Sequence, residues 1–415
     1  SPDQGANGIP MNSVEVKDRR LIIRMQQMMM TYEGNLSEDA KTIKGTFKQG
    51  RIEIPMDLTR AKMEKQTNWR PQDPRDFPYN QEGIKFKNKA AEINLAGTLT
   101  TPKNGKFDKV VVLISGSGPQ NRDSEVMQFN HRPFLVLSDY LTRNGIAVLR
   151  YDERGVAESE GDFSGVTSRI LADDVNAAVD YLKGRKDMKR KKIGLVGHSE
   201  GGMIAPIVAS ENKNVDFIAS LAGPGIDIVE LMLLQNEKTS LDEGVSKEIV
   251  EGNIKCLRPI YEFIRDNPKM EKEELTPNLE RMFQDGLKHF PESVREEMGD
   301  WDEMAEGTIK TLTRNWFLYF MRHKPSEYIS KVKCPVLAIN GEFDLQVTAK
   351  ENLEGFRKIL KKAKNKNVTI QEIPKQNHLF QNTQTGSISE YKTIEETFNE
   401  GTMGIIADWI KNHDK

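Results

Sequence analysis

A serine framed by glycines stands near the middle of the chain, in the run Gly197-His198-Ser199-Glu200-Gly201-Gly202. The pattern Gly-x-Ser-x-Gly is typical of a nucleophilic serine on a sharp turn between a strand and a helix. The apolar run Ile193 to Val196 predicts a buried strand before it, and Met203 to Ser210 predicts a helix after it. We therefore take Ser199 as the candidate nucleophile. The alternative is a glycine-rich turn that has no catalytic role.

A nucleophilic serine needs a base, and the base needs a carboxylate to orient it. His378 comes directly after the last predicted strand, Val368 to Ile373, and Asp344 follows the preceding predicted strand, Val336 to Asn340. Parallel strands end at one edge of a sheet, so these loops are expected to meet above the serine. The order serine, acid, histidine predicts a triad of Ser199, Asp344 and His378. Glu342 remains the alternative carboxylate.

An oxyanion hole requires backbone N–H groups that point at the developing alkoxide. The amide of Glu200, directly after the nucleophile, is one candidate. The second is expected in the glycine-rich loop Ser115-Gly116-Ser117-Gly118-Pro119, which follows the apolar run Val110 to Ile114. Ser117 is the preferred donor and Gly118 the alternative, while an ordinary glycine loop would supply neither.

The elements that must position these residues alternate between strands and helices from about residue 83. A predicted hairpin (84–86 and 93–100) is followed by strand, helix, strand and helix up to the strand 217–221. Such alternation predicts an α/β fold with a mostly parallel sheet and helices on both faces. The sheet is interrupted at residues 226–328, which look helical throughout, and it resumes at 336–340.

The chain therefore divides into three predicted parts. Residues 1–80 form a small all-β segment, in which Gly34, Gly45 and Gly50 are read as turns. Residues 81–225 and 329–415 form the catalytic domain, and residues 226–328 form a helical cap over it. The proline-rich stretch 69–78 reads as a linker between the β segment and the catalytic domain.

Aromatic residues at helical spacing mark one stretch of the predicted cap. Trp316, Phe317 and Phe320 are candidates for the wall of a substrate pocket, and they fit the core of the cap equally well. Elsewhere, the charged residues Arg122, Asp123, Asp152 and Arg154 follow predicted strands. An ion-pair network that braces the oxyanion loop is the expected role for them.

The composition excludes several classes of function. Sixty Lys and Arg residues nearly balance 62 Asp and Glu residues, so nucleic-acid binding has no electrostatic support. The apolar runs are far shorter than the roughly 20 residues that a membrane-spanning helix needs. Cys256 and Cys334 are widely spaced, which favours two free thiols over a zinc site. No metal or cofactor is expected, and the composition does not reveal the oligomeric state.

Five segments carry a resemblance to a known family: Gly116 to Asp123, Tyr151 to Gly155, Gly197 to Gly201, Asn340 to Val347 and Asn377 to Gln381. Over residues 83 to 413 the chain resembles the EstD-type carboxylesterases, bacterial enzymes of the α/β-hydrolase superfamily. The resemblance implies the same triad and cleavage of short acyl esters without a cofactor. The expected partner is a small-molecule or glycan-linked ester substrate. Ser115 departs from the histidine that many α/β-hydrolases have before the oxyanion glycine.

The first residues resemble the end of a small β domain that precedes such hydrolases in exported proteins of the Bacteroidetes type. That likeness implies a periplasmic or extracellular location, with a cytoplasmic one still open, and it implies that the first strands of this domain lie outside the chain. We expect a serine hydrolase that works through an acyl-enzyme. A peptidase or amidase using the same triad is the main alternative, and a non-catalytic binding protein is a third.

Overall fold

The computed structural model describes residues 13–25, 30–49, 52–59, 70–297 and 300–413. The chain divides near residue 70 into two compact units. No helix in these described ranges is both long and apolar enough to cross a membrane. Both cysteines are free thiols, as the sequence predicted.

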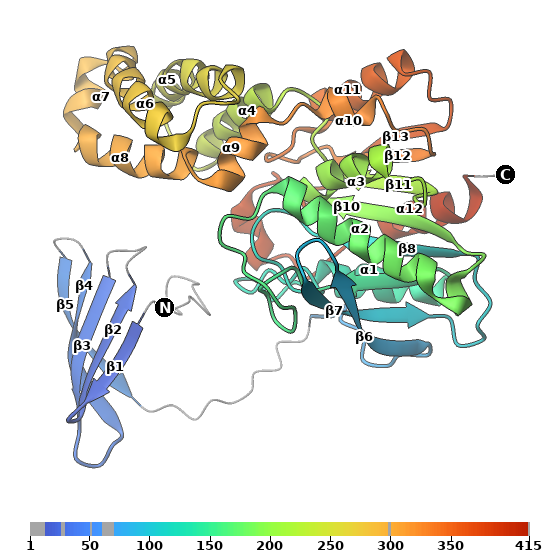
Figure 1. Ribbon diagram of the computed structural model, residues 1–415. Helices are drawn as coiled ribbons and strands as arrows, with labels where there is room; N and C mark the ends of the chain where they lie inside the picture. The colour runs from blue at the N-terminus through green and yellow to red at the C-terminus, as the bar shows by residue number, and fades with distance from the viewer. Residues whose placement is uncertain (1–12, 26–29, 50–51, 60–69, 298–299, 414–415) are drawn as a thin grey trace. The chain divides into compact units, whose positions relative to one another are not determined.

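The first unit is a five-stranded antiparallel sheet in which each strand pairs with the next one along the chain (Figure 1). Its strands are β1 (Ser13–Lys17), β2 (Arg20–Met25), β3 (Met30–Leu36), β4 (Thr42–Gln49) and β5 (Ile52–Thr59). Apolar residues of neighbouring strands stand opposite one another, as in the row Ile23, Tyr32, Phe47 and Ile54. Because side chains alternate along a strand, these residues share one face of the sheet.

Two glycines that were predicted to be turns lie inside strands instead. Gly34 of β3 pairs with Gly45 of β4, and the ring of Tyr32 lies across both. A Cβ atom on Gly45 would stand 2.4 Å from the Tyr32 hydroxyl oxygen. That hydroxyl donates to the carbonyl of Ile43 or Met56, at 3.2 and 3.1 Å. The prediction was wrong because glycine serves here to make room for an aromatic ring. Gly50 lies outside the described residues.

The second unit is built on an eight-stranded sheet with the order β13-β12-β11-β10-β8-β9-β7-β6. Its strands are β6 (Asn80–Asn88), β7 (Ile93–Thr101), β8 (Lys109–Ile114), β9 (Ala147–Tyr151), β10 (Lys192–His198), β11 (Phe217–Leu221), β12 (Val336–Gly341) and β13 (Val368–Ile373). The strands from β13 to β9 are parallel, and the hairpin of β6 and β7 joins antiparallel at one edge. Every residue of β8, β9, β11 and β12 is buried, as expected for strands covered on both faces.

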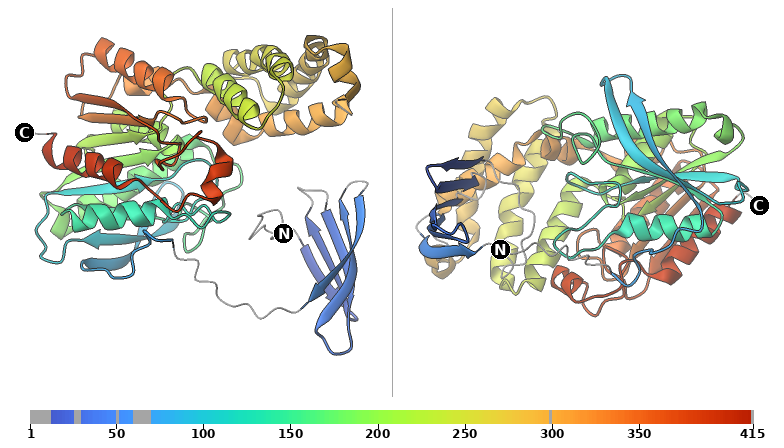
Figure 2. Two further views of the ribbon diagram at one scale, coloured as in Figure 1. Left: turned by 180° about the vertical axis from the view of Figure 1, so that it is seen from behind. Right: turned by 90° about the horizontal axis from the view of Figure 1, so that it is seen from below.

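Helices cover both faces of this sheet. In Figure 1 the near face carries α2 (Ser168–Gly184) and α3 (Glu200–Glu211), and one apolar cluster joins them and α11 (Ala349–Lys362) to the strands. The view from behind in Figure 2 shows α1 (Pro133–Arg143) and α12 (Glu400–Asn412) on the opposite face, where a second cluster lies. This is the α/β arrangement predicted from the alternation of strands and helices.

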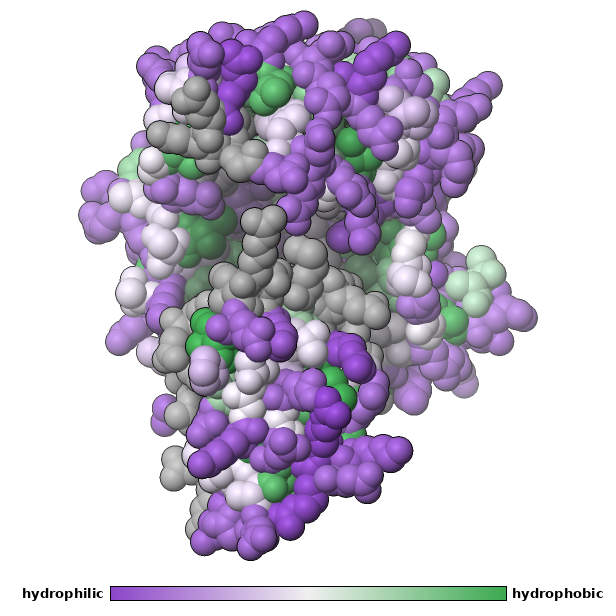
Figure 3. Space-filling view, turned by 90° about the vertical axis from the view of Figure 1, so that its left-hand side faces the viewer, coloured by the Kyte–Doolittle hydropathy of each residue, from purple (hydrophilic) through white to green (hydrophobic). Residues whose placement is uncertain are grey.

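A block of helices is inserted between β11 and β12. It comprises α4 (Ile228–Asp242), α5 (Lys247–Asp266), α6 (Lys272–Gly286), α7 (Glu292–Glu297), α8 (Trp301–Leu312), α9 (Asn315–Arg322) and α10 (Pro325–Ile329). Helices α4, α5, α6, α8 and α9 share an apolar core of their own. The surface of the insertion in the upper part of Figure 3 is mainly hydrophilic.

Short 3-10 turns lie at Lys186–Met188, Leu287–His289 and Ile388–Lys392.

The described part of the predicted linker is held against the second unit. Gln72 accepts hydrogen bonds from the backbone N–H groups of Thr397 and Phe398, at 2.5 and 3.0 Å. Asp73 is buried and forms an ion pair of 2.6 Å with Arg132. Residues 70–73 are thus fixed to the α/β unit, which the proline-rich composition alone did not indicate.

Candidate active site

Ser199 lies at the sharp turn that joins β10 to α3. Its backbone has φ +55° and ψ −120°, a conformation that residues other than glycine seldom adopt. Such strain costs on the order of 1–3 kcal/mol and persists only where the surroundings impose it. Here the Ser199 N–H donates to the carbonyl of Leu221, and its carbonyl accepts from Gly202, both at 2.8 Å. These two hydrogen bonds therefore hold the turn in its strained conformation.

The glycines around Ser199 are required by close backbone approach. A Cβ atom on Gly197 would stand 2.0 Å from the carbonyl oxygen of Gly201, and one on Gly201 would stand 2.1 Å from that of Ile114. A Cβ atom on Gly116, in the loop after β8, would stand 3.1 Å from Cβ of Ser199. The strand, the turn and the loop after β8 are thus packed backbone against backbone.

Asp344 and His378 are joined by a hydrogen bond. His378 Nδ1 lies 2.7 Å from Asp344 Oδ2, and the side chains are 6% and 0% exposed. The other carboxylate oxygen, Oδ1, accepts from the backbone N–H groups of Gln346 and Val347, at 2.8 and 2.9 Å. Because a carboxylate oxygen accepts, Nδ1 carries the proton and Nε2 of a neutral ring is free to act as a base.

Glu342, the alternative acid, lies elsewhere. Its side chain is exposed and accepts from the backbone N–H of Lys375 at 2.9 Å. The loop that carries His378 is built by the neighbouring Asn377, whose Oδ1 accepts from the N–H groups of Leu379 and Gln381, both at 3.0 Å. The acid that faces His378 is therefore Asp344.

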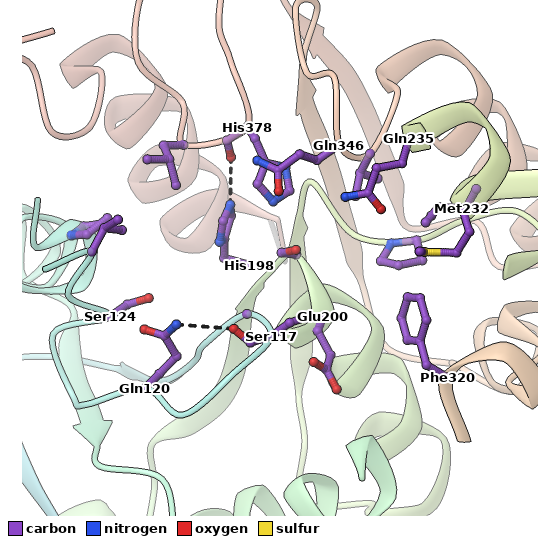
Figure 4. A pocket seen from close by; sticks show the side chains of 18 of the residues that line it. Ser117, Gln120, Ser124, His198, Glu200, Met232, Gln235, Phe320, Gln346 and His378 are labelled. Carbon is purple, nitrogen blue, oxygen red and sulfur yellow. Dashed lines mark hydrogen bonds between the residues drawn. The ribbon is translucent and has the colours of Figure 1, made fainter. Parts of the chain in front are cut away.

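His198 supports the same loop from the end of β10. Its Nε2 lies 2.7 Å from the backbone carbonyl oxygen of His378, and the two imidazole rings lie 4.7 Å apart (Figure 4). Burial, and repulsion by the nearby His378 ring, lower the pKa of His198 to about 3. His198 is therefore neutral near pH 7 and carries its proton on Nε2, because a carbonyl can only accept.

The residues predicted to supply the oxyanion hole, Glu200 and Ser117, line the same cavity as Ser199, and their role stays a prediction. Glu200 is the first residue of α3, so its N–H has no partner within the helix, and the helix dipole favours negative charge there. Ser117 and Gly116 line the same cavity as Ser199. Gly118, the alternative donor, has φ +88° and is not among the described residues that line the cavity.

The loop after β8 is braced by charged residues at the end of β9. The Arg122 side chain binds the buried carboxylate of Asp152 at 2.5 and 3.1 Å, and the Arg122 N–H donates to the same group. Arg150 pairs with Asp123. Farther along, Arg154 makes two bonds of 2.7 Å with Asp174, which holds the segment after β9 on α2. The expected ion-pair network is thus present.

Ser199 and His378 open onto a cavity of about 390 Å³. The predicted pocket residues Trp316 and Phe320 line it from α9, and their rings stack at 5.1 Å. Phe317 does not line the cavity, so this part of the prediction was wrong. Residues four apart share a face of a helix, whereas Phe317 turns toward Tyr261 of α5, 6.0 Å away.

The side chain of Glu200 joins the turn at Ser199 to the inserted helices. Its Oε1 accepts from the Ser168 hydroxyl at 2.5 Å and from the Trp316 indole N–H at 2.9 Å. Burial raises the pKa of this carboxyl. Glu200 thus bonds to α2 and α9 through its side chain.

Several lining residues were not found from the sequence. They are Gln120, Ser124, Leu231, Met232, Gln235, Gln346 and Val347. Gln346 and Val347 lie in the same motif as Asp344, and Gln120 lies in the motif that contains Ser117, so these motifs held a usable signal. The residues from α4 carry no such mark, because only the packing of the inserted helices brings them to the cavity.

Comparison with known proteins gives a family-model match that spans more than half of the chain. A family model described as serine aminopeptidase, S33, matches residues 132–384 of the 415 residues. Esterase EstD from Thermotoga maritima is 26% identical over 267 residues, which is 64% of this chain and 54% of that protein. An uncharacterised 31.7 kDa protein from Escherichia coli is 24% identical over 201 residues, which is 48% of this chain and 62% of that protein. The chain thus spans between half and two thirds of these relatives.

Solved structures with a similar fold include two hydrolases. Esterase Pf2001 from Pyrococcus furiosus has a TM-score of 0.49 and 17% identity, covering 84% of this chain and 95% of that one. Proline iminopeptidase from Mycobacterium smegmatis has a TM-score of 0.47 and 15% identity, covering 80% of this chain and 99% of that one.

Proposed function

Because this chain belongs to the serine aminopeptidase S33 family of α/β-hydrolases, we propose that it is a serine esterase that acts through an acyl-enzyme. The relative from Thermotoga maritima carries the name esterase, which agrees with this proposal. The observation that supports the proposal most directly is the arrangement of side chains around Ser199. His378, which is hydrogen-bonded to the buried Asp344, opens onto the same cavity as Ser199, and Ser199 is held in a strained turn.

In the first step Ser199 Oγ attacks the ester carbonyl, and His378 Nε2 takes the hydroxyl proton. Negative charge develops on the carbonyl oxygen, where the amides of Glu200 and Ser117 stabilise it. Asp344 stays ionised and stabilises the imidazolium of His378. The bond to the alcohol oxygen then breaks, and His378 returns its proton to the departing alcohol.

In the second step a water molecule takes the place of the alcohol. His378 removes a proton from this water as the oxygen attacks the acyl carbonyl, and the same two amides bind the second oxyanion. The bond to Ser199 Oγ breaks, Oγ regains its proton from His378, and the carboxylic acid leaves. Both half-reactions balance without a cofactor.

The chemistry of the cavity supports an ester in preference to a peptide with a free amino terminus. An aminopeptidase needs an anion that receives the substrate's ammonium group. Among the described residues that line the cavity, Glu200 has the only carboxyl side chain. Its Oε1 is bonded to Ser168 and Trp316, and its Oε2 has no hydrogen-bond partner among the described residues. Burial raises the pKa of this carboxyl, which disfavours the charged form that an ammonium group would need.

A comparison of two substrate classes tests this choice. The wild-type protein is assayed with 4-nitrophenyl acetate and with the 4-nitroanilides of L-alanine and L-proline. We expect kcat/KM to be at least about a hundredfold higher for the ester. An amide turned over as fast as the ester would instead make the protein an aminopeptidase. A fluorophosphonate that fails to label Ser199 would favour a binding protein without catalysis.

A further inference from the structure

The cavity around Ser199 has two halves of different chemistry. Figure 4 shows Gln120 and Ser124 on one side of His198 and His378, and Met232, Gln235 and Phe320 on the other. The first half comes from the loop after β8, and the second comes from the inserted helices α4 and α9. A substrate bound across Ser199 therefore meets a polar wall at one end and a largely apolar wall at the other.

The polar half carries neutral hydrogen-bonding groups beside the apolar Val126 and Pro133. Ser117 and Ser124 offer hydroxyl groups, of which that of Ser117 also interacts with Glu200, and Gln120 offers a primary amide. The Gln120 amide donates to the backbone carbonyl of Ser117 at 3.3 Å, which uses one of its two N–H donors. Neutral donors and acceptors of this kind bind hydroxyl groups. They provide no countercharge for a phosphate or an ammonium group.

The chain holds these polar groups in place. The Gln120 N–H donates to the buried carboxylate of Glu153 at 2.9 Å, and the Glu153 N–H donates to the Gln120 carbonyl at 3.1 Å. Ser124 is buried and has φ +50°, with its N–H bonded to the carbonyl of Asn121 at 2.9 Å. The polar wall is thus fixed before a ligand binds, which lowers the entropic cost of binding.

The opposite half is lined mainly by apolar side chains. Leu231 and Met232 come from α4, the stacked rings of Trp316 and Phe320 come from α9, and Val347 follows Asp344. Leu231, Phe320 and Val347 are between 3% and 6% exposed, while Met232, Trp316 and the polar Gln235 of this half are half-buried. The total of about 390 Å³ is room for roughly a dozen non-hydrogen atoms, at about 30 Å³ for each water-sized group.

The reaction order decides which half holds which part of an ester. The acyl group stays in the site through both steps, whereas the alcohol must leave before water can attack. At the polar side Ser117 is exposed, Gln120 is half-buried and Ser124 is buried, whereas no described lining residue from α4 or α9 is exposed, so the polar side is the more open one. The less open apolar half therefore suits the acyl group, and the more open polar half suits the departing alcohol.

We propose that the substrates are esters of a short apolar acid with a polyhydroxylated alcohol, a sugar ring or a compound of similar polarity. Ser117, Gln120 and Ser124 bind the hydroxyl groups of the alcohol, and the wall from α4 and α9 holds the acyl group. This inference rests on the proposed esterase function. It adds Gln120 and Ser124 as residues that determine specificity.

Two acetates with a common ring size test the inference. Methyl 6-O-acetyl-glucopyranoside and cyclohexylmethyl acetate are both esters of a primary alcohol on a six-membered ring, and the sugar ester differs by its hydroxyl groups, its methoxy group and its ring oxygen. We expect the wild-type kcat/KM to be at least roughly tenfold higher for the sugar ester, which is what two neutral hydrogen bonds supply. A ratio of one or less would overturn the inference.

Two variants locate the source of this ratio. Gln120→Leu and Ser124→Ala are each expected to lower the ratio severalfold toward one. The matched control is Met232→Ala, which removes apolar wall and should shift the preference between acetate and butyrate while leaving the ratio unchanged. If the ratio stays at its wild-type value in both polar variants, the inference is wrong. If Gln120→Leu does not fold, the result for Ser124→Ala decides.

The same experiment separates this inference from the esterase proposal. If Ser199→Ala abolishes the hydrolysis of cyclohexylmethyl acetate and the wild-type ratio is near one, the sugar preference is wrong while the serine esterase proposal stands. Hydrolysis that survives in Ser199→Ala contradicts the serine esterase itself, and the inference fails with it.

Discussion

The imidazole of His198 donates a hydrogen bond of 2.7 Å to the backbone carbonyl of His378. The residue before the candidate nucleophile thus holds the backbone of the candidate base. This bond joins two residues separated by 180 positions in the chain, one of which is the residue proposed to receive the proton from Ser199. His198 acts through His378, so we regard it as a positioning residue.

Removing this hydrogen bond should misplace His378. His198→Phe keeps an aromatic ring beside His378 and removes the N–H donor, so we expect kcat to fall about ten- to a hundredfold with little change in KM. His198→Gln retains an amide donor and should recover part of the loss. The measurement is steady-state kinetics with 4-nitrophenyl acetate, and a kcat unchanged in His198→Phe would show that the bond has no positioning role.

Acid should destabilise the fold through buried histidines. His323 is buried and stacks on Tyr328, and burial lowers its pKa from the ordinary 6.5 to about 4. Below pH 6.5 the unfolded chain therefore binds a proton that the folded protein does not accept until about pH 4. For this one residue, the free energy of unfolding should fall by about 2 kcal/mol between pH 7.5 and 5.0.

Urea denaturation of the wild type and of His323→Phe at those two pH values measures this contribution. The variant keeps the stacked ring and loses the titrating group, so its stability should fall by about 2 kcal/mol less than that of the wild type. His131 and His198, whose pKa values are also lowered, contribute equally to both proteins. An identical loss of stability in the two proteins would contradict the assignment.

The indole N–H of Trp316 should contribute to the stability of the protein in addition to the packing of its ring. Trp316→Phe keeps an aromatic ring but leaves the buried Glu200 carboxyl with one donor fewer, which costs about 1–3 kcal/mol in the free energy of unfolding. The matched control is Trp301→Phe on α8, because the Trp301 N–H has no partner among the described residues. Urea denaturation should show a loss in the first variant only. Equal losses would mean that ring size, and not the bond to Glu200, is responsible.

Phe320 and Phe317 should differ in their effect on acyl specificity. Phe320 lines the cavity, so Phe320→Ala is expected to raise the ratio of octanoate to acetate hydrolysis severalfold. Phe317 packs in the core of the insertion, so Phe317→Ala should destabilise the protein by about 3–5 kcal/mol without changing that ratio. Rates for 4-nitrophenyl esters of increasing chain length give the answer. A shift in chain-length preference for Phe317→Ala would place it at the substrate.

The sequence was most informative where the fold forces residues together. Ser199, Asp344 and His378 each follow a strand of one parallel sheet, so the strand pattern alone predicted that their loops meet. The close approach of Gly116, Gly197 and Gly201 to backbone atoms explains why the motif needs glycine at these positions.

The sequence was least informative where contacts depend on how separate elements pack. Gly34 and Gly45 were read as turns because a glycine beneath a tyrosine ring looks the same in sequence as one in a loop. Phe317 shares the aromatic run of Trp316 and Phe320, and only the direction of α9 tells them apart. The bond from His198 to a backbone carbonyl leaves no spacing signal, so its role required the structure.

The most direct test of the account is the turnover of 4-nitrophenyl acetate by Ser199→Ala. The substitution removes only Oγ, so far-ultraviolet circular dichroism and the urea midpoint should match those of the wild type. We predict that kcat falls at least about a thousandfold, because no other group replaces the nucleophile. A folded Ser199→Ala protein that hydrolyses the ester near the wild-type rate would contradict the assignment of Ser199 and the mechanism built on it.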